Sequence, residues 1–258
     1  MMKIHQTAII DKKAKLGKNV DIGPYVIIKE NIEIGDGTVI DAHVYIEGKT
    51  KIGKNCHIYA GAVIGTSPQD VGYKGDQSSV LIGDDNIIRE YVTIHRSKHK
   101  DGITSIGNEN FFMGSVHIAH DCKIGNKVVI VNYSAATGHV IIEDKAFVSG
   151  MVGIHQFVRI GTMAMIGGMS KITQDVPPYV IVDGHPAKPY GLNKVGLVRN
   201  KVIQHARAEL KKAYKILYSR NMAVDKAINI IKDELDLSLP EVRHFVEFVE
   251  SSKRGICK

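Results

Sequence analysis

The sequence predicts an all-β solenoid of short strands followed by a smaller helical domain. Apolar residues, mostly isoleucine, recur at every sixth position from Ile4 to Ile172. Glycine often follows directly after this residue, as at Gly35 and Gly125. From about Asn193 onward, glycine becomes rare and Leu, Lys, Ala and Glu predominate. The first two features predict the solenoid, and the third predicts where it gives way to helices.

The six-residue period matches neither the 3.6-residue repeat of a helix nor the two-residue repeat of a half-exposed strand. It fits a coil in which each six residues form a short strand and a turn, with the isoleucine pointing inward. Three such units close a triangular coil of eighteen residues. Residues eighteen apart are therefore expected one above the other, at the roughly 4.8 Å spacing of paired strands. Glycine suits the corners because it lacks a Cβ and tolerates positive φ.

The register is interrupted twice, between Ile64 and Ile82 and between Ile94 and Ile106, and resumes in phase both times. Two loops, 65–81 and 95–105, are therefore expected to protrude from a corner. The first reads either as a surface excursion or as a functional loop on a rigid scaffold. The second is rich in charge and reads as a solvated tip. Residues 1–64 read as scaffold without chemistry.

Polar side chains gather between Ile106 and Ile172, where a scaffold does not need them: His117, His120, Asp121, His139, His155 and Gln156. Counting eighteen residues per coil puts Gly138 one coil above His120 and Gln156 two coils above it. The same count puts His139 above Asp121. The sequence thus predicts a single polar patch about three strands tall.

This patch suits general-base catalysis, because an imidazole can accept a proton near neutral pH. Asp121 can fix the tautomer of His120, provided that a local turn brings these consecutive side chains together. A backbone N–H at Gly138 can stabilise an oxyanion, and direct transfer needs no Ser or Cys nucleophile. Zinc is an alternative for a histidine cluster. No metal motif is recognisable, however, and neither a metal nor a cofactor is expected.

The prism is expected to span residues 1–190. Pro177 and Pro178 cannot donate to a strand ladder, so they are expected to end the solenoid repeat. Residues 191–258 are expected to form the helical domain. Ala206, Leu210, Ala213 and Leu217 have the spacing of an amphipathic helix. Two further helices are expected at 225–235 and 239–251, the latter with a proline suited to its first turn.

The composition indicates which classes of partner the protein could bind and in which cellular compartment it is expected. The formal net charge is +7, which favours an anionic partner such as nucleic acid, a nucleotide-sugar or an acidic carrier protein. No apolar run approaches the roughly 20 residues of a membrane span, and no secretory signal is visible. The three cysteines are too scattered for a disulfide framework, so reduced thiols and a cytoplasmic location are expected.

Five sequence runs carry a family resemblance: Gln69-Asp70, His117-Ile118-Ala119-His120-Asp121, Gly138-His139-Val140, His155-Gln156-Phe157 and Gln174-Asp175-Val176-Pro177-Pro178-Tyr179. Together with the hexads, they resemble the acyl-carrier-protein-dependent UDP-N-acetylglucosamine O-acyltransferases, hexapeptide-repeat acyltransferases that begin lipid A biosynthesis. The resemblance implies a left-handed parallel β-helix, a homotrimer with sites between subunits, and no cofactor. It implies acyl carrier protein and a UDP-sugar as partners, and no nucleic acid.

The resemblance also implies residue roles. His120 would be the general base, Asp121 its orienting partner and Gly138 the oxyanion donor. The expected contacts to the sugar or the pantetheine-linked acyl group are Gln69, Asp70, His117, His139, His155 and Gln156. Asn193 and Arg199 match positions that meet the UDP end. A column of small residues includes Gly150 and Gly168. This column is either corner geometry or, with Met169, the groove that measures acyl length.

Several alternatives stay open. The chain departs from the commonest family pattern at Gly72, Val195 and Asn200, which leaves open whether the acceptor carries a 3-hydroxyl or a 3-amine. The sequence does not indicate the length of the acyl chain either. Another hexapeptide acyl- or acetyltransferase, including the N-acyltransferase of the same pathway, would share the repeat. A non-catalytic scaffold or carbohydrate-binding solenoid would share it too, but would not need the histidine patch.

Overall fold

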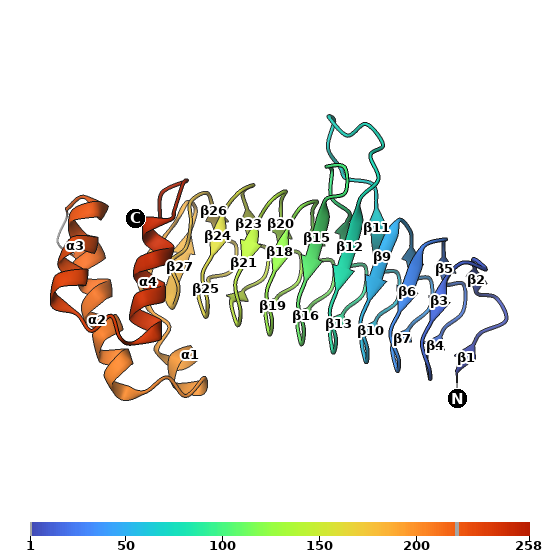
Figure 1. Ribbon diagram of the computed structural model, residues 1–258, viewed down its shortest axis with the longest axis horizontal. Coiled ribbons are helices and arrows are strands. Elements are labelled where there is room, and N and C mark those ends of the chain that lie inside the picture. The colour runs from blue at the N-terminus through green and yellow to red at the C-terminus, as the bar shows by residue number, and fades with distance from the viewer. Residues whose placement is uncertain (1, 220–221) are drawn as a thin grey trace.

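A long three-sided prism, capped at one end by helices, forms the molecule (Figure 1). The computed structural model describes residues 2–219 and 222–258. Strands from successive coils pair in parallel and form one sheet along each side of the prism. The parallel β-helix is left-handed, as the family resemblance implied and against the right-handed rule for ordinary crossovers. The all-β solenoid prediction is confirmed.

The three sheets are named A, B and C in the order in which the chain first visits them. Sheet A is formed by β1 (Lys3–Ile4), β4 (Asp21–Ile22), β7 (Val39–Ile40), β10 (His57–Ile58), β13 (Ile87–Ile88), β16 (Phe111–Phe112), β19 (Val129–Ile130), β22 (Phe147–Val148), β25 (Met165–Ile166), β27 (Val180–Gly184) and β28 (Ala187–Leu192). Sheet B is formed by β2 (Ile9–Ile10), β5 (Ile27–Ile28), β8 (Tyr45–Ile46), β11 (Val63–Thr66), β14 (Thr93–His95), β17 (His117–Ile118), β20 (Ala135–Ala136), β23 (Gly153–Ile154) and β26 (Lys171–Ile172). Sheet C is formed by β3 (Lys15–Leu16), β6 (Ile32–Ile34), β9 (Lys49–Ile52), β12 (Ser79–Ile82), β15 (Ile103–Ile106), β18 (Lys123–Ile124), β21 (Ile141–Ile142) and β24 (Arg159–Ile160).

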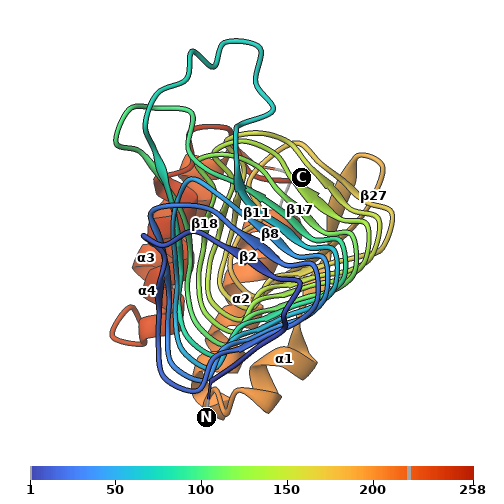
Figure 2. The ribbon, with the colours of Figure 1, turned by 90° about the vertical axis from the view of Figure 1, so that its right-hand side faces the viewer.

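The eighteen-residue register is visible in the strand pairing. Ile118 pairs with Ala136, and Ala136 pairs with Ile154. Across the two interruptions the partners are further apart in sequence, but the phase is kept: Ile58 pairs with Ile88, and Ile88 with Phe112. The extra residues form loops 67–78 and 96–102, which are shorter than the expected 65–81 and 95–105 because the flanking strands extend into them. Both loops project from the same corner of the prism (Figure 2).

The interior contains two hexad rows instead of the one that the sequence made obvious. The isoleucine row is buried throughout the middle of the prism. A second row, two residues earlier in each hexad, is also buried and is built from small side chains: Val20, Val26, Val44, Cys56, Ala62, Val92, Val116, Cys122, Val128, Val140, Ala146, Val152, Val158 and Ala164. Large and small side chains alternate along the chain and fill a narrow core. The three cysteines are buried and unpaired.

The corner glycines are needed for close approach between coils. A Cβ on Gly35 would lie 2.5 Å from the backbone carbonyl carbon of Gly53, one coil above. Positive φ occurs at some turn glycines, such as Gly37 and Gly65, and at non-glycine residues of other turns, such as Asn55 and Lys127. The expected role of glycine is therefore correct for the missing Cβ at Gly35 and for the positive φ at Gly65, although other residues also adopt positive φ in these turns.

The prediction that Pro177 and Pro178 end the ladder is wrong. Beyond them, β27 pairs in parallel with β25 and in antiparallel fashion with β28, so sheet A continues to Leu192. The prolines fall in the turn between β26 and β27, where no ladder hydrogen bond is needed from them.

Four helices follow the hairpin: α1 (Lys194–Arg199), α2 (Gln204–Ser219), α3 (Val224–Glu234) and α4 (Pro240–Glu250). The three amphipathic helices expected from the sequence are present, and a proline occupies the first turn of α4. This helix is fixed to the prism, because His244 Nε2 lies 2.7 Å from Glu143 Oε2 and Arg159 stacks over the Phe248 ring at 4.1 Å. Among the described residues, no helix is long and apolar enough to cross a membrane.

Replacing Ile106 by alanine should lower the free energy of unfolding by about 2–5 kcal/mol, because its side chain is 3% exposed and its loss leaves a cavity in the core. Ile103→Ala on the same strand is the matched control. Ile103 is 47% exposed, so its removal should cost about 1 kcal/mol or less. Urea denaturation measures both values, and equal losses would contradict the assignment of inward and outward positions.

Candidate active site

The polar patch lies at the corner where the chain passes from sheet B to sheet C, below the two projecting loops. His120 and Asp121 occupy the turn between β17 and β18, and Gly138 and His139 occupy the turn one coil above. The backbone N–H of His139 donates to the carbonyl of His120 (3.0 Å), which joins the two turns. Loop 67–78 brings Asp70 to the same place, as its contacts below show. The expected clustering of these residues is therefore observed.

His120 and Asp121 form a hydrogen-bonded pair. The Nδ1–H of His120 donates to Asp121 Oδ2 at 2.8 Å, and the imidazole is only 7% exposed. Consecutive side chains can meet in this way because Asp121 has a φ of +62°, which is the local turn that the sequence required. The pair fixes one tautomer of His120 and leaves its Nε2 free to accept a proton.

The Asp121 carboxylate is held by several donors. Its Oδ1 accepts the hydroxyl of Ser97, and its Oδ2 also accepts the backbone N–H of Lys98 at 3.2 Å. Burial raises the pKa of this carboxyl, but the hydrogen bonds from Ser97 and His120 outweigh burial, so the net shift is downward. Asp121 is therefore ionised at neutral pH and can stabilise a positive charge on His120.

Glycine is required at position 138, one coil above His120, for a steric reason. A Cβ at this position would lie 2.5 Å from Cε1 and 2.7 Å from Nε2 of His120, so only glycine leaves room for the imidazole. The backbone N–H of Gly138 has no hydrogen-bond acceptor within the described part of the chain. An unused donor thus lies beside the free nitrogen of the His120 imidazole.

Asp70 comes from the first loop and approaches the other side of His120, with its Oδ2 3.6 Å from His120 Nε2. The same oxygen accepts the ammonium of Lys98 at 2.9 Å, and Oδ1 accepts the N–H of Gly72 at 2.7 Å. The Lys98 hydrogen bond is the main reason why the pKa of Asp70 is lowered. The loop itself is held by Arg96, whose Nη2 donates to the hydroxyls of Ser67 at 3.0 Å and Tyr73 at 3.3 Å.

Two further histidines flank the pair. His139 meets His120 edge-on with ring centroids 5.3 Å apart, and it stacks on Phe157 at 4.5 Å. His117 lies on the outer face of sheet B, where its Nδ1 is 2.8 Å from the hydroxyl of Thr93. Burial, followed by the nearby His95, lowers the pKa of His117 to about 4. His117 is thus a neutral hydrogen-bonding group at physiological pH.

Of the remaining residues predicted from the sequence, some lie at the B–C corner and others lie at the A–B corner or at helix α1. Gln69, His155 and Gln156 are exposed at the B–C corner, and their side chains are not engaged with His120. Gly150, Gly168 and Met169 lie at the corner between sheets A and B. Asn193 caps α1 by accepting the Gly196 N–H at 2.8 Å, and Arg199 is exposed at the end of that helix. Within one chain, the glycines and Met169 of the A–B corner and the two residues of α1 therefore do not lie next to His120.

The interpretation of the second loop as a solvated tip is correct for His99, Lys100 and Asp101, which are exposed, but wrong for the residues at its base. Ser97 is fully buried and orients Asp121, while Lys98 pairs with Asp70. His95 is also buried, and its Nδ1–H donates to the Ser67 carbonyl at 2.7 Å. The sequence analysis did not predict these contacts, because the six-residue register stops at the loop and the eighteen-residue count then gives no neighbours for loop residues. The interruption of the register was the one feature of the sequence that could have drawn attention to this loop.

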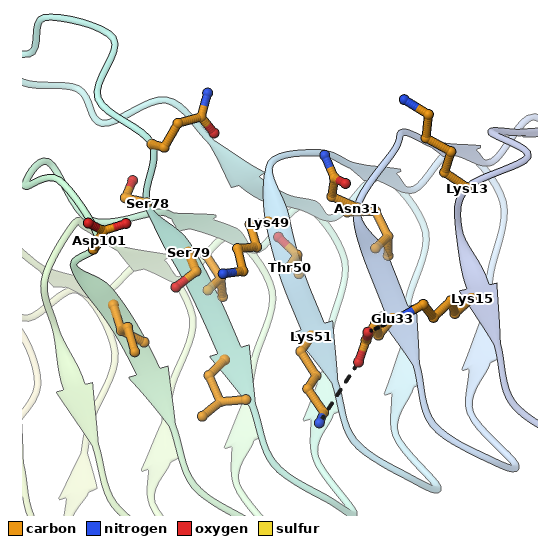
Figure 3. Close-up of a pocket in the computed structure, with 15 residues that line it drawn as sticks. Lys13, Lys15, Asn31, Glu33, Lys49, Thr50, Lys51, Ser78, Ser79 and Asp101 are labelled. Carbon is orange, nitrogen blue, oxygen red and sulfur yellow. Dashed lines mark hydrogen bonds and ion pairs between the residues drawn. The ribbon is translucent and has the colours of Figure 1, made fainter.

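Two cavities in the surface of the prism were compared as possible substrate sites. An open groove of about 430 Å³ runs from Asp121 and His139 along sheet C, with basic residues on its walls: Lys123, Arg159, Lys253 and Arg254. A cavity of about 700 Å³ lies further toward the N-terminus, where Lys15, Glu33, Lys49 and Lys51 point from β3, β6 and β9 (Figure 3). The latter contains none of the histidine patch, so its size does not make it the reaction site.

Comparison with known proteins identifies close relatives. A family model described as Udp N-acetylglucosamine O-acyltransferase, Domain 2 matches residues 175–257, and one described as bacterial transferase hexapeptide (six repeats) matches residues 31–66. The acyl-[acyl-carrier-protein]–UDP-N-acetylglucosamine O-acyltransferase of Thermodesulfovibrio yellowstonii is 53% identical over 259 residues, covering 100% of both chains.

Two solved structures are similar over nearly the whole fold. The UDP-N-acetylglucosamine acyltransferase of Bacteroides fragilis superposes with a TM-score of 0.96 at 39% identity, covering 99% of this chain and 100% of that one. The corresponding protein of Francisella novicida gives a TM-score of 0.95 at 40% identity, covering 100% of this chain and 94% of that one.

Replacing Lys98 by glutamine should raise the pKa of Asp70, because the lysine hydrogen bond favours the ionised carboxylate and is the largest cause of the downward shift. Lys100→Gln is the control, since Lys100 is an exposed residue of the same loop and makes no ion pair with Asp70. A carbon-13 NMR titration of the carboxyl groups measures the change. The same Asp70 pKa in both variants would contradict the Lys98 contact.

Proposed function

The chain belongs to the UDP-N-acetylglucosamine O-acyltransferase family, and from this premise we propose how its residues perform acyl transfer. The reaction moves an acyl chain from acyl carrier protein to the 3-position of the glucosamine of UDP-N-acetylglucosamine, which is the first step of lipid A biosynthesis. One observation supports the residue roles above all others. The Nε2 of His120, backed by Asp121, lies beside the unpaired N–H of Gly138.

In the proposed mechanism, the sugar 3-hydroxyl attacks the thioester carbonyl carbon while His120 Nε2 takes the hydroxyl proton. A C–O bond forms, and the carbonyl electron pair moves to oxygen. The resulting oxyanion accepts the Gly138 N–H, a donor already fixed by the fold. Collapse of the tetrahedral intermediate breaks the C–S bond, and the proton on His120 passes to the leaving thiolate. Asp121 stabilises the charged imidazole between these two events.

The flanking residues are proposed to bind and position substrates. Asp70 and Gln69 would face the sugar from the first loop, while His117, His139, His155 and Gln156 would line its path and that of the pantetheine-linked acyl group. The pKa of His117, about 4, supports a neutral hydrogen-bonding role for it, because it stays uncharged through the reaction. The basic walls of the groove beside Asp121 and His139 suit the phosphates of the nucleotide or of phosphopantetheine.

A homotrimer is proposed because the expected site residues occupy separate parts of one chain. Gly150, Gly168 and Met169 would form the acyl groove from a neighbouring subunit, and Asn193 and Arg199 would meet the UDP end. Exposed apolar side chains at the A–B corner support this contact: Tyr133 is 65% exposed, Met151 58% and Met169 73%. Apolar residues aligned along one edge are typical of a surface that is covered in an assembly.

The proposed chemistry uses neither a metal nor another cofactor, since the acyl donor already carries an activated thioester. Acyl carrier protein is the protein partner, and its acidic character suits the net charge of +7 of this chain. No nucleic acid takes part. We place the reaction in the cytoplasm, in keeping with three unpaired cysteine thiols in the core.

His120→Ala should lower kcat by about 10²- to 10⁴-fold, the usual effect of removing a positioned base, and leave the fold unchanged. The rate is measured by mass spectrometry of the product formed from UDP-N-acetylglucosamine and a set of acyl carrier protein thioesters. The mass also reports acyl length, and resistance of the product to mild alkali distinguishes an amide from an ester.

His5→Ala is the control, because His5 is an exposed histidine near the N-terminus whose side chain bonds only Thr7. It should retain wild-type turnover. Near-normal turnover of His120→Ala would refute the assignment of the base, and a lack of any product from acyl carrier protein thioesters would refute the proposed donor.

Gly168→Met should shorten the preferred acyl chain if the small-residue column holds it. A Cβ at Gly168 would meet only the Gly150 carbonyl at 3.6 Å and Ser149 at 3.9 Å, so the fold tolerates a side chain there. Gly168→Ala is the graded control and should change the preference less. A competition assay with mixed acyl donors measures it, and an unchanged preference in Gly168→Met would remove the groove assignment.

A further inference from the structure

Three side chains beside the proposed base form a cluster of metal-ligand atoms: His99, Asp121 and His139. One donor atom from each lies within 4.8 Å of the other two. Asp121 and His139 come from adjacent turns at the B–C corner, and His99 reaches them from loop 96–102. Within residues 2–219 and 222–258 this is the sole group of its kind.

The two imidazoles are available as ligands. Neither ring has a hydrogen bond to another described residue, so no existing bond must break before a metal binds. The His139 ring is held flat against Phe157, at an interplanar angle of 8°.

The ligand atoms need to move only slightly closer together to bind a zinc ion. His139 Nε2 lies 3.8 Å from Asp121 Oδ2, whereas donor atoms in a tetrahedral zinc site with bonds of about 2.0–2.2 Å lie about 3.4 Å apart. His99 is exposed and its ring centroid is 5.6 Å from that of His139, so a rotation of its side chain can complete the site.

The surroundings also resemble those of a metal site. Ser97 donates to the other oxygen of Asp121 and so fixes the carboxylate, as outer-sphere partners of metal ligands do. The cations that oppose a metal are Lys98, whose ammonium is paired with Asp70 at 2.9 Å, and the basic residues on the walls of the adjoining groove. Two imidazoles, one carboxylate and an open side for water match the preference of Zn²⁺.

We propose that His99, Asp121 and His139 bind Zn²⁺, and that this binding inhibits acyl transfer. The carboxylate oxygen offered to the metal, Asp121 Oδ2, is the one that accepts the Nδ1–H of His120. A divalent cation on that oxygen weakens its support of His120 and disfavours a second positive charge on the imidazole. The binding site stands on the geometry alone, whereas the inhibition rests on the proposed role of His120.

Metal binding is measured first, without reference to activity. Chelator-treated protein is titrated with Zn²⁺ by calorimetry and with Co²⁺ by visible absorption, whose intensity reports tetrahedral coordination. Wild type and the control His5→Ala should bind one ion per chain. His99→Ala should bind about 10- to 100-fold more weakly, the loss caused by removing even an outer-sphere partner. Circular dichroism verifies the fold of each variant.

Inhibition is then measured on the same proteins. Wild-type activity should fall over the Zn²⁺ range in which the site fills and return when the chelator is added. His99→Ala should keep the basal rate and resist that range. Equal zinc affinity in wild type and His99→Ala, or no binding in wild type, would overturn the site. If binding depends on His99 but the rate does not change, the site stands and the inhibition is refuted. If the wild type is inactive, the proposed function is contradicted, and calorimetry still decides whether the metal site exists.

Discussion

Parallel pairing of strands one coil apart, which is eighteen residues outside the two loops, is the constraint on which the rest of the structure depends. Backbone N–H groups donate to carbonyls of the neighbouring coils, as in the bond from Gly125 to Ile142 on the next coil and the bond from His139 to His120 on the previous coil. A slip of one residue would turn every buried isoleucine outward. The cost of such a slip holds the register rigid, and a rigid register gives each corner residue a fixed neighbour above and below.

The site uses that rigidity in a specific way. His120 and Gly138 are neighbours only because they are one coil apart, and the missing Cβ of Gly138 creates the space that the imidazole fills. The positive φ of Asp121 turns its carboxylate onto the histidine of the same coil. An imidazole, its carboxylate partner and an unpaired amide N–H are thus fixed by the fold itself, and the proposed acyl transfer would use this fixed arrangement to stabilise its transition state.

The two loops add what a regular repeat does not supply. Asp70 and Lys98 arrive from different loops and pair at 2.9 Å next to His120. Gly72, one of the positions at which this chain departs from the commonest family pattern, donates only its backbone N–H to Asp70. The cation beside Asp70 is Lys98, which comes from the second loop and is distant in sequence but close in space.

The sequence by itself determined the prism, its three-unit coil, the helical end and the stacking of His120, Gly138 and His139, because a strict repeat converts sequence distance directly into spatial distance. It did not determine what happens where the repeat fails. The continuation of sheet A beyond Pro178, the burial of Ser97 and the pairing of Lys98 with Asp70 were decided only in the tertiary structure. Loop residues have no periodic partner, so their contacts depend on side-chain packing and charge between segments that the sequence does not align.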